Sequence, residues 1–345
     1  MSRFRALAAL AVGTALVLPG CAGTSAAPGA QEGSSTSATG SFPVTIDHAF
    51  GETTIEAEPK RVVTVSWGNQ EAALALGVVP VAMPKVTWGD EDGDGMLPWV
   101  KDKLDELGAQ TPTLMDETNG FDYEAIADAK PDVILGAYSG MTQEQYDTLS
   151  KIAPVVAFPE IAWGTTWQQM TLTDAKALGL EDQAQQLVSD LEKHVTDESA
   201  TYPALAGKKA LFTYIDPTDL STVGYYSTKD PRATYLDELG LVPSSAVEAS
   251  SATGDTFWFT ESTEKIENFS DVQVLTGYGT DATLAQLQAD PLWSRIPAIA
   301  NGAVAFLPDN TTLAAAGNPS PLSIGTSYGD DYIALVGKAA EKAAS

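Results

Sequence analysis

Cysteine and histidine, which recur in metal sites and in nucleophilic catalysis, are scarce in this 345-residue chain. It has one cysteine, Cys21, which excludes an internal disulfide and a cysteine-based metal site. Its two histidines are His48 and His194, and His194 falls on a predicted helix away from strand ends. No Gly-x-Ser-x-Gly motif occurs. We therefore expect no catalytic residue, no cofactor and no metal bound by protein side chains, although the 46 acidic residues leave carboxylate-only catalysis open.

An acidic segment from Asp90 to Gly95 begins like the calcium loop of an EF-hand. In such a loop the twelfth position is a glutamate that binds calcium through both oxygens. Here that position is Lys101. The segment is therefore expected to be a solvated acidic loop at the rim of a cleft.

Aromatic residues recur where predicted strands end. They offer large apolar faces with polar tips, which suits a half-hydrated ligand cleft, although any single one could equally pack in a core. Cations are scarce, and Arg232, Arg295 and Lys85 are the candidates for pairing with ligand oxygens or stacking on rings. The predicted ligand-binding set is Trp67, Trp88, Tyr138, Trp163, Tyr225, Arg232, Trp258 and Tyr278, with Trp167, Tyr226 and Phe257 in comparable positions.

These residues lie on an alternation of strands and helices, which is typical of a parallel sheet. Expected strands cover residues 42–50, 61–65, 78–83, 113–115, 131–135, 154–158, 209–214, 272–276 and 303–307. Expected helices cover residues 69–76, 98–107, 121–129, 143–152, 167–178, 181–200, 233–239, 263–266, 284–289 and 331–342. Because the alternation breaks at the two helices over 167–200, we expect two α/β lobes with a ligand between them, at the carboxyl ends of the strands.

The first twenty residues read as a signal peptide. Arg3 and Arg5 precede an apolar run from Ala6 to Leu18 that is short for a membrane span. Small residues before Cys21 resemble the lipobox of bacterial lipoproteins, although Pro19 departs from it and a plain secretory signal is the alternative. Residues 21–41 are rich in Gly, Ser, Ala and Thr and are expected to be a flexible tether.

The chain carries a net charge of −27, and −29 without the two arginines of the first twenty residues. Nucleic-acid binding needs a basic surface, so this charge argues against it. It favours solubility and names no ligand.

Three stretches have a characteristic composition and spacing. Residues 59–81 contain PKRVVTV and GNQEAALALGVVPV, residues 121–135 read FDYEAIADAKPDVIL, and residues 290–304 contain DPLW, IPA and NGAV. Together they resemble the iron-siderophore and cobalamin periplasmic binding proteins of ABC importers, over roughly residue 42 to the end. The resemblance implies a class III binding-protein fold: two Rossmann-like lobes with parallel sheets, joined by a long rigid helix.

The resemblance also implies roles for individual residues. Trp67 and Tyr138 match pocket positions of the family, so they rank first among the ligand-binding candidates. Each lobe of such a protein presents an acidic residue to arginines of the permease, and the matching positions are Glu124 and Asp237. The family usually has glutamate at the second position, and Glu238 is the alternative there.

The resemblance implies an extracytoplasmic lipoprotein, lipid-attached at Cys21, that captures a ferric siderophore and delivers it to an ABC permease and its ATPase. We expect a monomer, with iron present only inside the siderophore. Cobalamin and haem are alternative ligands, and a secreted carboxylate enzyme or a surface interaction protein are alternatives of other classes. The expected domains are residues 1–20 signal, 21–41 tether, 42–165 N-terminal lobe, 166–203 linking helices and 204–345 C-terminal lobe, with the binding-protein domain beginning near residue 60.

Overall fold

The computed structural model describes residues 40–343. The first sheet of this region contains β3 (Val62–Thr64), β4 (Ala82–Pro84), β5 (Thr113–Met115), β6 (Val133–Leu135) and β7 (Val155–Val156). Their order is β5-β4-β3-β6-β7, and every neighbouring pair is parallel. All residues of β3, β4 and β6 are buried, as expected for a parallel sheet covered on both faces.

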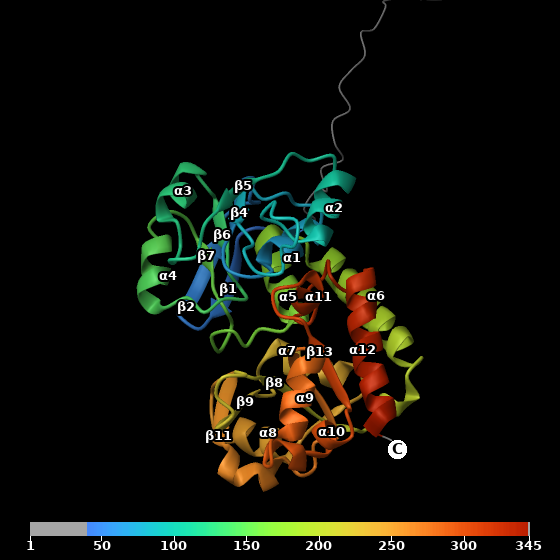
Figure 1. Ribbon diagram of the computed structural model, residues 1–345. Helices are drawn as coiled ribbons and strands as arrows, with labels where there is room; N and C mark the ends of the chain where they lie inside the picture. The colour runs from blue at the N-terminus through green and yellow to red at the C-terminus, as the bar shows by residue number, and fades with distance from the viewer. Residues whose placement is uncertain (1–39, 344–345) are drawn as a thin grey trace, which may run out of the picture. The chain divides into compact units, whose positions relative to one another are not determined.

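Helices α1 (Asn69–Ala75), α2 (Pro98–Glu106), α3 (Tyr123–Asp128) and α4 (Gln143–Leu149) connect these strands (Figure 1). The antiparallel hairpin of β1 (Val44–His48) and β2 (Gly51–Ile55) is a separate two-stranded sheet. We refer to this part of the molecule as the N-terminal lobe.

The second sheet contains β8 (Lys209–Tyr214), β9 (Thr222–Tyr226), β10 (Val242–Pro243), β11 (Trp258–Ser262), β12 (Val274–Tyr278) and β13 (Val304–Leu307). The main path is β11-β9-β8-β12-β13, and β10 pairs with β8. The helices of this C-terminal lobe are α7 (Pro231–Glu238), α8 (Ser245–Ser251), α9 (Asp281–Ala289), α10 (Pro297–Ala300) and the 3₁₀ segments Pro203–Leu205, Thr263–Phe269 and Trp293–Arg295.

The second sheet differs from the expected parallel one in a single strand, because β9 runs antiparallel to both of its neighbours. Only residues 215–221 connect β8 to β9. A parallel pair needs a crossover of a dozen or more residues, whereas a connection this short forms a hairpin. The remaining strands run parallel to β8, so the α/β class holds with one mixed sheet.

Two helices follow β7 and lead out of the N-terminal lobe. Helix α5 (Trp167–Leu178) begins with a capping box between Thr166 and Gln169 and ends at Gly179, where φ is 70°. Its residues Met170 and Leu178 pack in the same core as the strands of the N-terminal sheet. Helix α6 (Glu181–Ser199) is the long helix that reaches the C-terminal lobe, with its apolar stripe buried at Ala184, Val188 and Val195.

The chain then returns to the N-terminal lobe. After β13, helix α11 (Thr312–Ala316) packs with Ala315 and Ala316 against Leu74 and Met83 of the N-terminal lobe. Helix α12 (Ser327–Ala343) then runs beside α6 and packs on the C-terminal sheet (Figure 1). The lobes are therefore held by α6, by the segment around α11 and by α12, within one compact unit. The predicted domain boundaries stay a prediction.

No helix within residues 40–343 combines the length and the apolar character that a membrane crossing requires. The predicted signal peptide, Cys21 and nearly all of the predicted tether lie outside the described residues.

Candidate ligand-binding site

A cavity of about 400 Å³ lies between the two lobes. Most of its walls come from segments that follow the carboxyl ends of strands, which is where ligands bind in open α/β sheets. The N-terminal lobe contributes aromatic side chains, whereas the C-terminal lobe contributes aromatic and polar ones. The lining residues are Trp67, Trp88, Tyr138, Trp163, Tyr214, Tyr226, Arg232, Phe257, Tyr278, Asp309 and Asn318.

The structure brings six of the eight predicted ligand-binding residues to this cavity and leaves Tyr225 and Trp258 outside it. Successive residues of a strand point to opposite faces, so on β9 only Tyr226 faces the cavity. Tyr225 points into the other core, against Phe269, and its hydroxyl contacts the hydroxyl of Ser250 at 2.5 Å. Phe257 takes the lining position that was predicted for Trp258.

Trp258 instead packs beside Tyr226, its partner on the neighbouring strand, on the same face of the sheet. Its ring centroid lies 4.8 Å from that of Tyr226, at 65°. It also covers Gly224, where a Cβ would approach its ring to 2.3 Å. Trp258 therefore supports the Tyr226 ring, which lines the cavity, without lining the cavity itself.

The aromatic rings of the cavity meet edge to face. Trp88 lies 5.9 Å from Trp67 and 5.5 Å from Tyr278, at 62° and 86°, and so joins the two lobes. Tyr138 and Trp163 meet at 5.3 Å and 81°. Edge-to-face pairs are a favourable arrangement of aromatic rings.

Arg232 is the only cation among the described residues that line this cavity, and it is held on three sides. Its Nε and Nη2 donate to the two carboxylate oxygens of Asp230, at 2.9 and 2.7 Å. Its Nη1 donates to the hydroxyl of Tyr226 at 3.1 Å, and its guanidinium carbon lies 3.8 Å from the centre of that ring. A two-point carboxylate pair fixes the plane of a guanidinium. The orientation of Arg232 is therefore set before a ligand arrives.

Three phenols surround this guanidinium. Burial raises the pKa of Tyr226 to about 12, despite the opposing effect of Arg232. Burial also raises the pKa values of Tyr138 and Tyr278 above their ordinary value. All three are neutral hydroxyls at physiological pH, so they act as hydrogen-bond donors and acceptors. Tyr138 accepts from the side-chain amide of Asn318 at 3.2 Å.

The backbone at the cavity is strained in two places. Ser66 and Trp163 have positive φ angles of 62° and 59°, which are unfavourable for residues other than glycine. The backbone N–H of Trp163 donates to the carbonyl of Ser139 at 2.9 Å, which holds this conformation. The Trp163 ring crosses directly over Gly140, where a Cβ would lie 2.1 Å from Nε1. The missing side chain at Gly140 therefore leaves the space that the Trp163 ring occupies.

A second cavity of about 390 Å³ opens on the N-terminal lobe and shares Trp67, Trp88 and Trp163 with the first. It places Lys85 and Glu117 on its walls. Glu117 accepts from the backbone N–H of Ser66 at 2.9 Å, and burial raises the pKa of its carboxyl to about 7. Lys85 is thus near the three tryptophans but outside the first cavity.

Hydrogen bonds join the lobes beside the cavity. The indole of Trp88 donates to Asp309 at 3.0 Å, and the backbone N–H of Gly89 donates to Asn310 at 2.8 Å. Thr312 donates from its backbone N–H to Glu91 at 2.8 Å and from its hydroxyl to the Gly89 carbonyl at 3.0 Å. These bonds connect the segment after β4 to the segment after β13.

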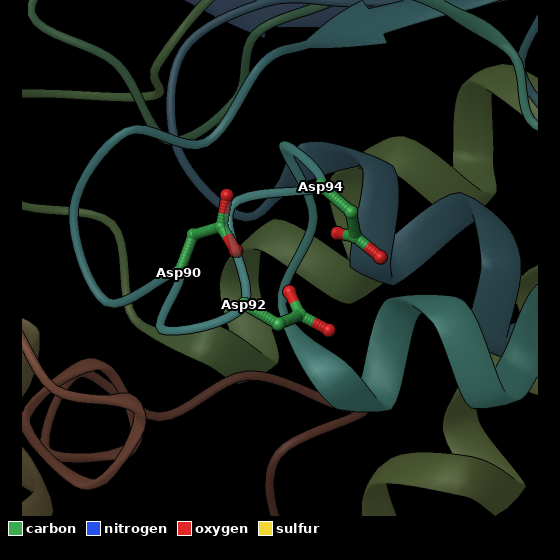
Figure 2. A group of neighbouring side chains, drawn as sticks. All are labelled: Asp90, Asp92 and Asp94. Carbon is green, nitrogen blue, oxygen red and sulfur yellow. The ribbon is translucent and has the colours of Figure 1, made fainter.

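The acidic loop from Asp90 to Gly95 follows directly after Gly89, which takes part in these bonds. Asp90, Asp92 and Asp94 each offer a carboxylate oxygen within 4.8 Å of the others (Figure 2). Asp90 accepts from two backbone N–H groups of its own loop, those of Gly93 and Gly95, at 2.8 and 2.7 Å. Lys101, the residue at the twelfth loop position, pairs with Asp94 at 2.5 Å and with Asp92 at 3.5 Å. Local donors therefore engage all three carboxylates.

The two predicted docking residues lie far from each other in the chain, one on each lobe. Glu124 is exposed in the first turn of α3. Asp237 is exposed near the end of α7, although desolvation of its carboxyl raises its pKa to about 6. The alternative, Glu238, accepts from Trp167 and Gln168 of α5, both at 3.1 Å, so its oxygens are engaged between the lobes.

Two further candidates from the sequence, Arg295 and Trp167, do not line the cavity. Arg295 is exposed in a 3₁₀ turn away from the cavity, and Trp167 is buried. The lining residues Tyr214, Asp309 and Asn318 were not singled out, nor was Asp230, which does not line the cavity. Period-2 alternation on β9 was the available signal for Tyr226. Asn318 follows α11 in a segment whose return to the N-terminal lobe the sequence does not indicate.

The chain matches the family model described as "Periplasmic binding protein" over residues 62–311. It therefore belongs to the periplasmic binding protein family. A curated relative, the "Probable siderophore-binding lipoprotein YfiY" of Bacillus subtilis, is 32% identical, over 75% of this chain and 78% of the relative.

Solved structures of similar proteins share the α/β fold of this chain. PiaA of Streptococcus pneumoniae, crystallised in complex with ferrichrome, is 44% identical with a TM-score of 0.82, covering 86% of this chain and 99% of PiaA. A periplasmic solute-binding protein of Mycobacterium smegmatis is 27% identical with a TM-score of 0.65, covering 86% of this chain and 99% of that protein. The α/β two-lobed class predicted from the sequence is thereby confirmed.

Proposed function

We propose that this chain is the solute-binding lipoprotein of an ABC importer and that it captures a ferric siderophore in the cavity between its lobes. The observation that carries the proposal is the cavity itself: a wall of aromatic rings around one fixed guanidinium. A siderophore supplies its own iron ligands, so its binding protein needs only apolar faces and a few polar groups. The likeness to PiaA with ferrichrome and to YfiY supports the same ligand class.

Within that class, the charges of the cavity favour a neutral ferric hydroxamate. The charge of Arg232 is balanced by Asp230, and the second charged group of the lining, Asp309, is an acid. A ferric complex of three hydroxamates has no net charge, whereas a ferric tris-catecholate carries three negative charges. An anion of that size would need several unpaired cations. The ferrichrome named for PiaA and the hydroxamate named for a second relative, YxeB, are consistent with this choice.

Haem and cobalamin are the competing ligands within the family fold. An axial tyrosine would bind haem iron as a phenolate. Burial raises the pKa of every tyrosine beside Arg232, so a phenolate would have to form against that shift. This disfavours haem as the ligand.

The remaining parts of the proposal concern partners and location. Cys21 would carry the lipid, on the extracytoplasmic face of the cell membrane, and Glu124 and Asp237 would meet the permease that works with an ATPase. The protein would act as a monomer without catalysis, a cofactor or nucleic acid, and its iron would be part of the siderophore.

Native mass spectrometry tests the ligand class. The protein is isolated without denaturation from iron-starved cells, and the mass of any co-purified ligand is measured before and after iron is stripped. The proposal expects an organic chelator whose mass falls by that of one iron less the protons that replace the iron. A corrinoid, a haem or turnover of an ester or glycoside by the same preparation would contradict it.

A further inference from the structure

Asp230 has an environment that ordinary helix capping does not explain. Its side chain is completely buried, and it forms a pair with Arg232, of which only 15% is exposed. Both carboxylate oxygens are committed to the guanidinium. One of these two oxygens, Oδ1, also accepts from the backbone N–H of Arg232, at 2.9 Å, and so caps α7. One carboxylate thus caps a helix and neutralises the cation of the cavity.

Removing that negative charge would have a clear electrostatic effect. Arginine stays protonated at any physiological pH, so Arg232 without Asp230 would bring an uncompensated positive charge to the cavity. Away from water such a charge attracts an anion far more strongly than it would at the surface. In the ion pair of Arg232 with Asp230 the two charges balance, so the cavity does not attract an anion in this way.

We propose that Asp230 is a specificity-determining residue that makes the cavity discriminate against anionic ferric chelates. This inference rests on the proposed function and adds to it the residue that sets the charge of the accepted ligand. Asp230 acts through Arg232 and does not itself line the cavity. The opposite arrangement, with an unpaired arginine, would select anionic complexes instead.

The substitution Asp230→Asn separates charge from capping. Asparagine is as good an N-cap as aspartate and has nearly the same shape. The variant therefore keeps an oxygen for the start of α7 and loses the negative charge, although its amide nitrogen can no longer accept from Nη2 of Arg232. Asp122, which caps α3 by accepting from Ala125 at 3.0 Å and does not line either cavity, supplies the matched control Asp122→Asn.

Two ligands that differ in one charge provide the readout: the N-acetyl and N-succinyl derivatives of a ferric linear trihydroxamate, which are neutral and singly anionic. Dissociation constants are measured by calorimetry for the wild type, D230N and D122N. The ratio of the two constants is expected to shift by about tenfold or more toward the anionic ligand in D230N. In D122N the ratio should match that of the wild type.

The possible results distinguish a failure of the role of Asp230 from a failure of the proposed function. An unchanged ratio in D230N, with measurable binding, would overturn the role of Asp230 and leave the proposed function intact. Wild-type protein that binds neither derivative nor ferrichrome would overturn the proposed function itself. If D230N does not fold, Asp230→Ser, which keeps a capping oxygen without charge, takes its place. A D230S variant with the wild-type ratio would again contradict the inference.

Discussion

At Gly140 the backbone passes so close to the indole of Trp163 that a methyl group has no room. Trp163 itself has a positive φ of 59° and lines the cavity between the lobes. Backbone strain and departures from local residue preferences are most common at functional sites.

The substitution Gly140→Ala is therefore expected to displace the Trp163 ring and to weaken chelate binding by about tenfold, as loss of a well-packed anchor does. A double-mutant cycle with Trp163→Ala checks the mechanism. In the absence of the ring, G140A should cost little further affinity. Equal losses in both backgrounds would show that Gly140 acts in another way.

At the residue scale, the structure brings six of the eight predicted ligand-binding residues to the cavity between the lobes, and their role stays a prediction. Aromatics at strand ends meet there because parallel strands bring their carboxyl ends together. The choice between Tyr225 and Tyr226 depends on which face β9 turns to the lobe interface, whereas Phe257 precedes β11 and Trp258 is the first residue of that strand. That register is fixed by the reversed strand β9 and its partner β11, neither of which was predicted.

At the scale of elements, a buried carboxyl joins three segments. Glu71 of α1 accepts from the indole of Trp99 of α2 at 2.6 Å and from the hydroxyl of Ser320, which follows α11. Burial raises its pKa to about 7, against opposing effects of both hydrogen bonds. The segment that returns to the N-terminal lobe is thus attached to α1 through an ionisable group.

This pKa predicts how stability depends on pH. Between about pH 4.5 and 7 the unfolded chain has lost the Glu71 proton while the folded protein keeps it, so stability falls as pH rises. The loss is on the order of 3 kcal/mol, at about 1.4 kcal/mol per pKa unit, and is complete above pH 7. Glu71→Gln should flatten the curve of melting temperature against pH in this window.

The control is Glu341→Gln, on the exposed face of α12, which should leave the curve as it is in the wild type. An E71Q curve that falls as steeply as the wild-type curve would mean that Glu71 does not titrate in this range.

Some elements could be predicted from sequence and others could not, for physical reasons. The bounds of β5, α5 and β8 match the prediction. A capping box and Gly179 mark the ends of α5, and β8 is an apolar run with four buried residues, whereas β5 has only one. The missed helix α8 is a serine-rich stretch with low helix propensity, and β2 is short and polar. Helix α11 has only five residues and forms because it packs on the N-terminal lobe, which no local pattern records.

At the scale of the whole molecule, the proposed lipid on Cys21 determines where the protein works. The wild type is expected to sediment with membranes after cell fractionation. Cys21→Ser removes the acylated thiol, so this variant should appear in the soluble extracytoplasmic fraction or the medium. Detergent extraction of wild-type membranes serves as the control for trapped soluble protein. A membrane-bound C21S variant would contradict the lipid anchor.

The two lobes and their class were predictable because three stretches of the chain resemble one family at the right spacing. The cavity was predictable only as a place, between the lobes. Its walls depend on contacts such as Trp88 with Asp309 and Tyr138 with Asn318, which join residues far apart in sequence.

Tryptophan fluorescence tests whether a ferric chelate binds among these aromatic rings, because three of the seven tryptophans line the cavity. Ferrichrome should quench the emission saturably, whereas iron-free ferrichrome should not. Trp67→Ala and Tyr138→Phe should weaken the affinity by about tenfold, and Tyr225→Phe, outside the cavity, should preserve it. Absence of quenching, or wild-type affinity in both cavity variants, would contradict the account.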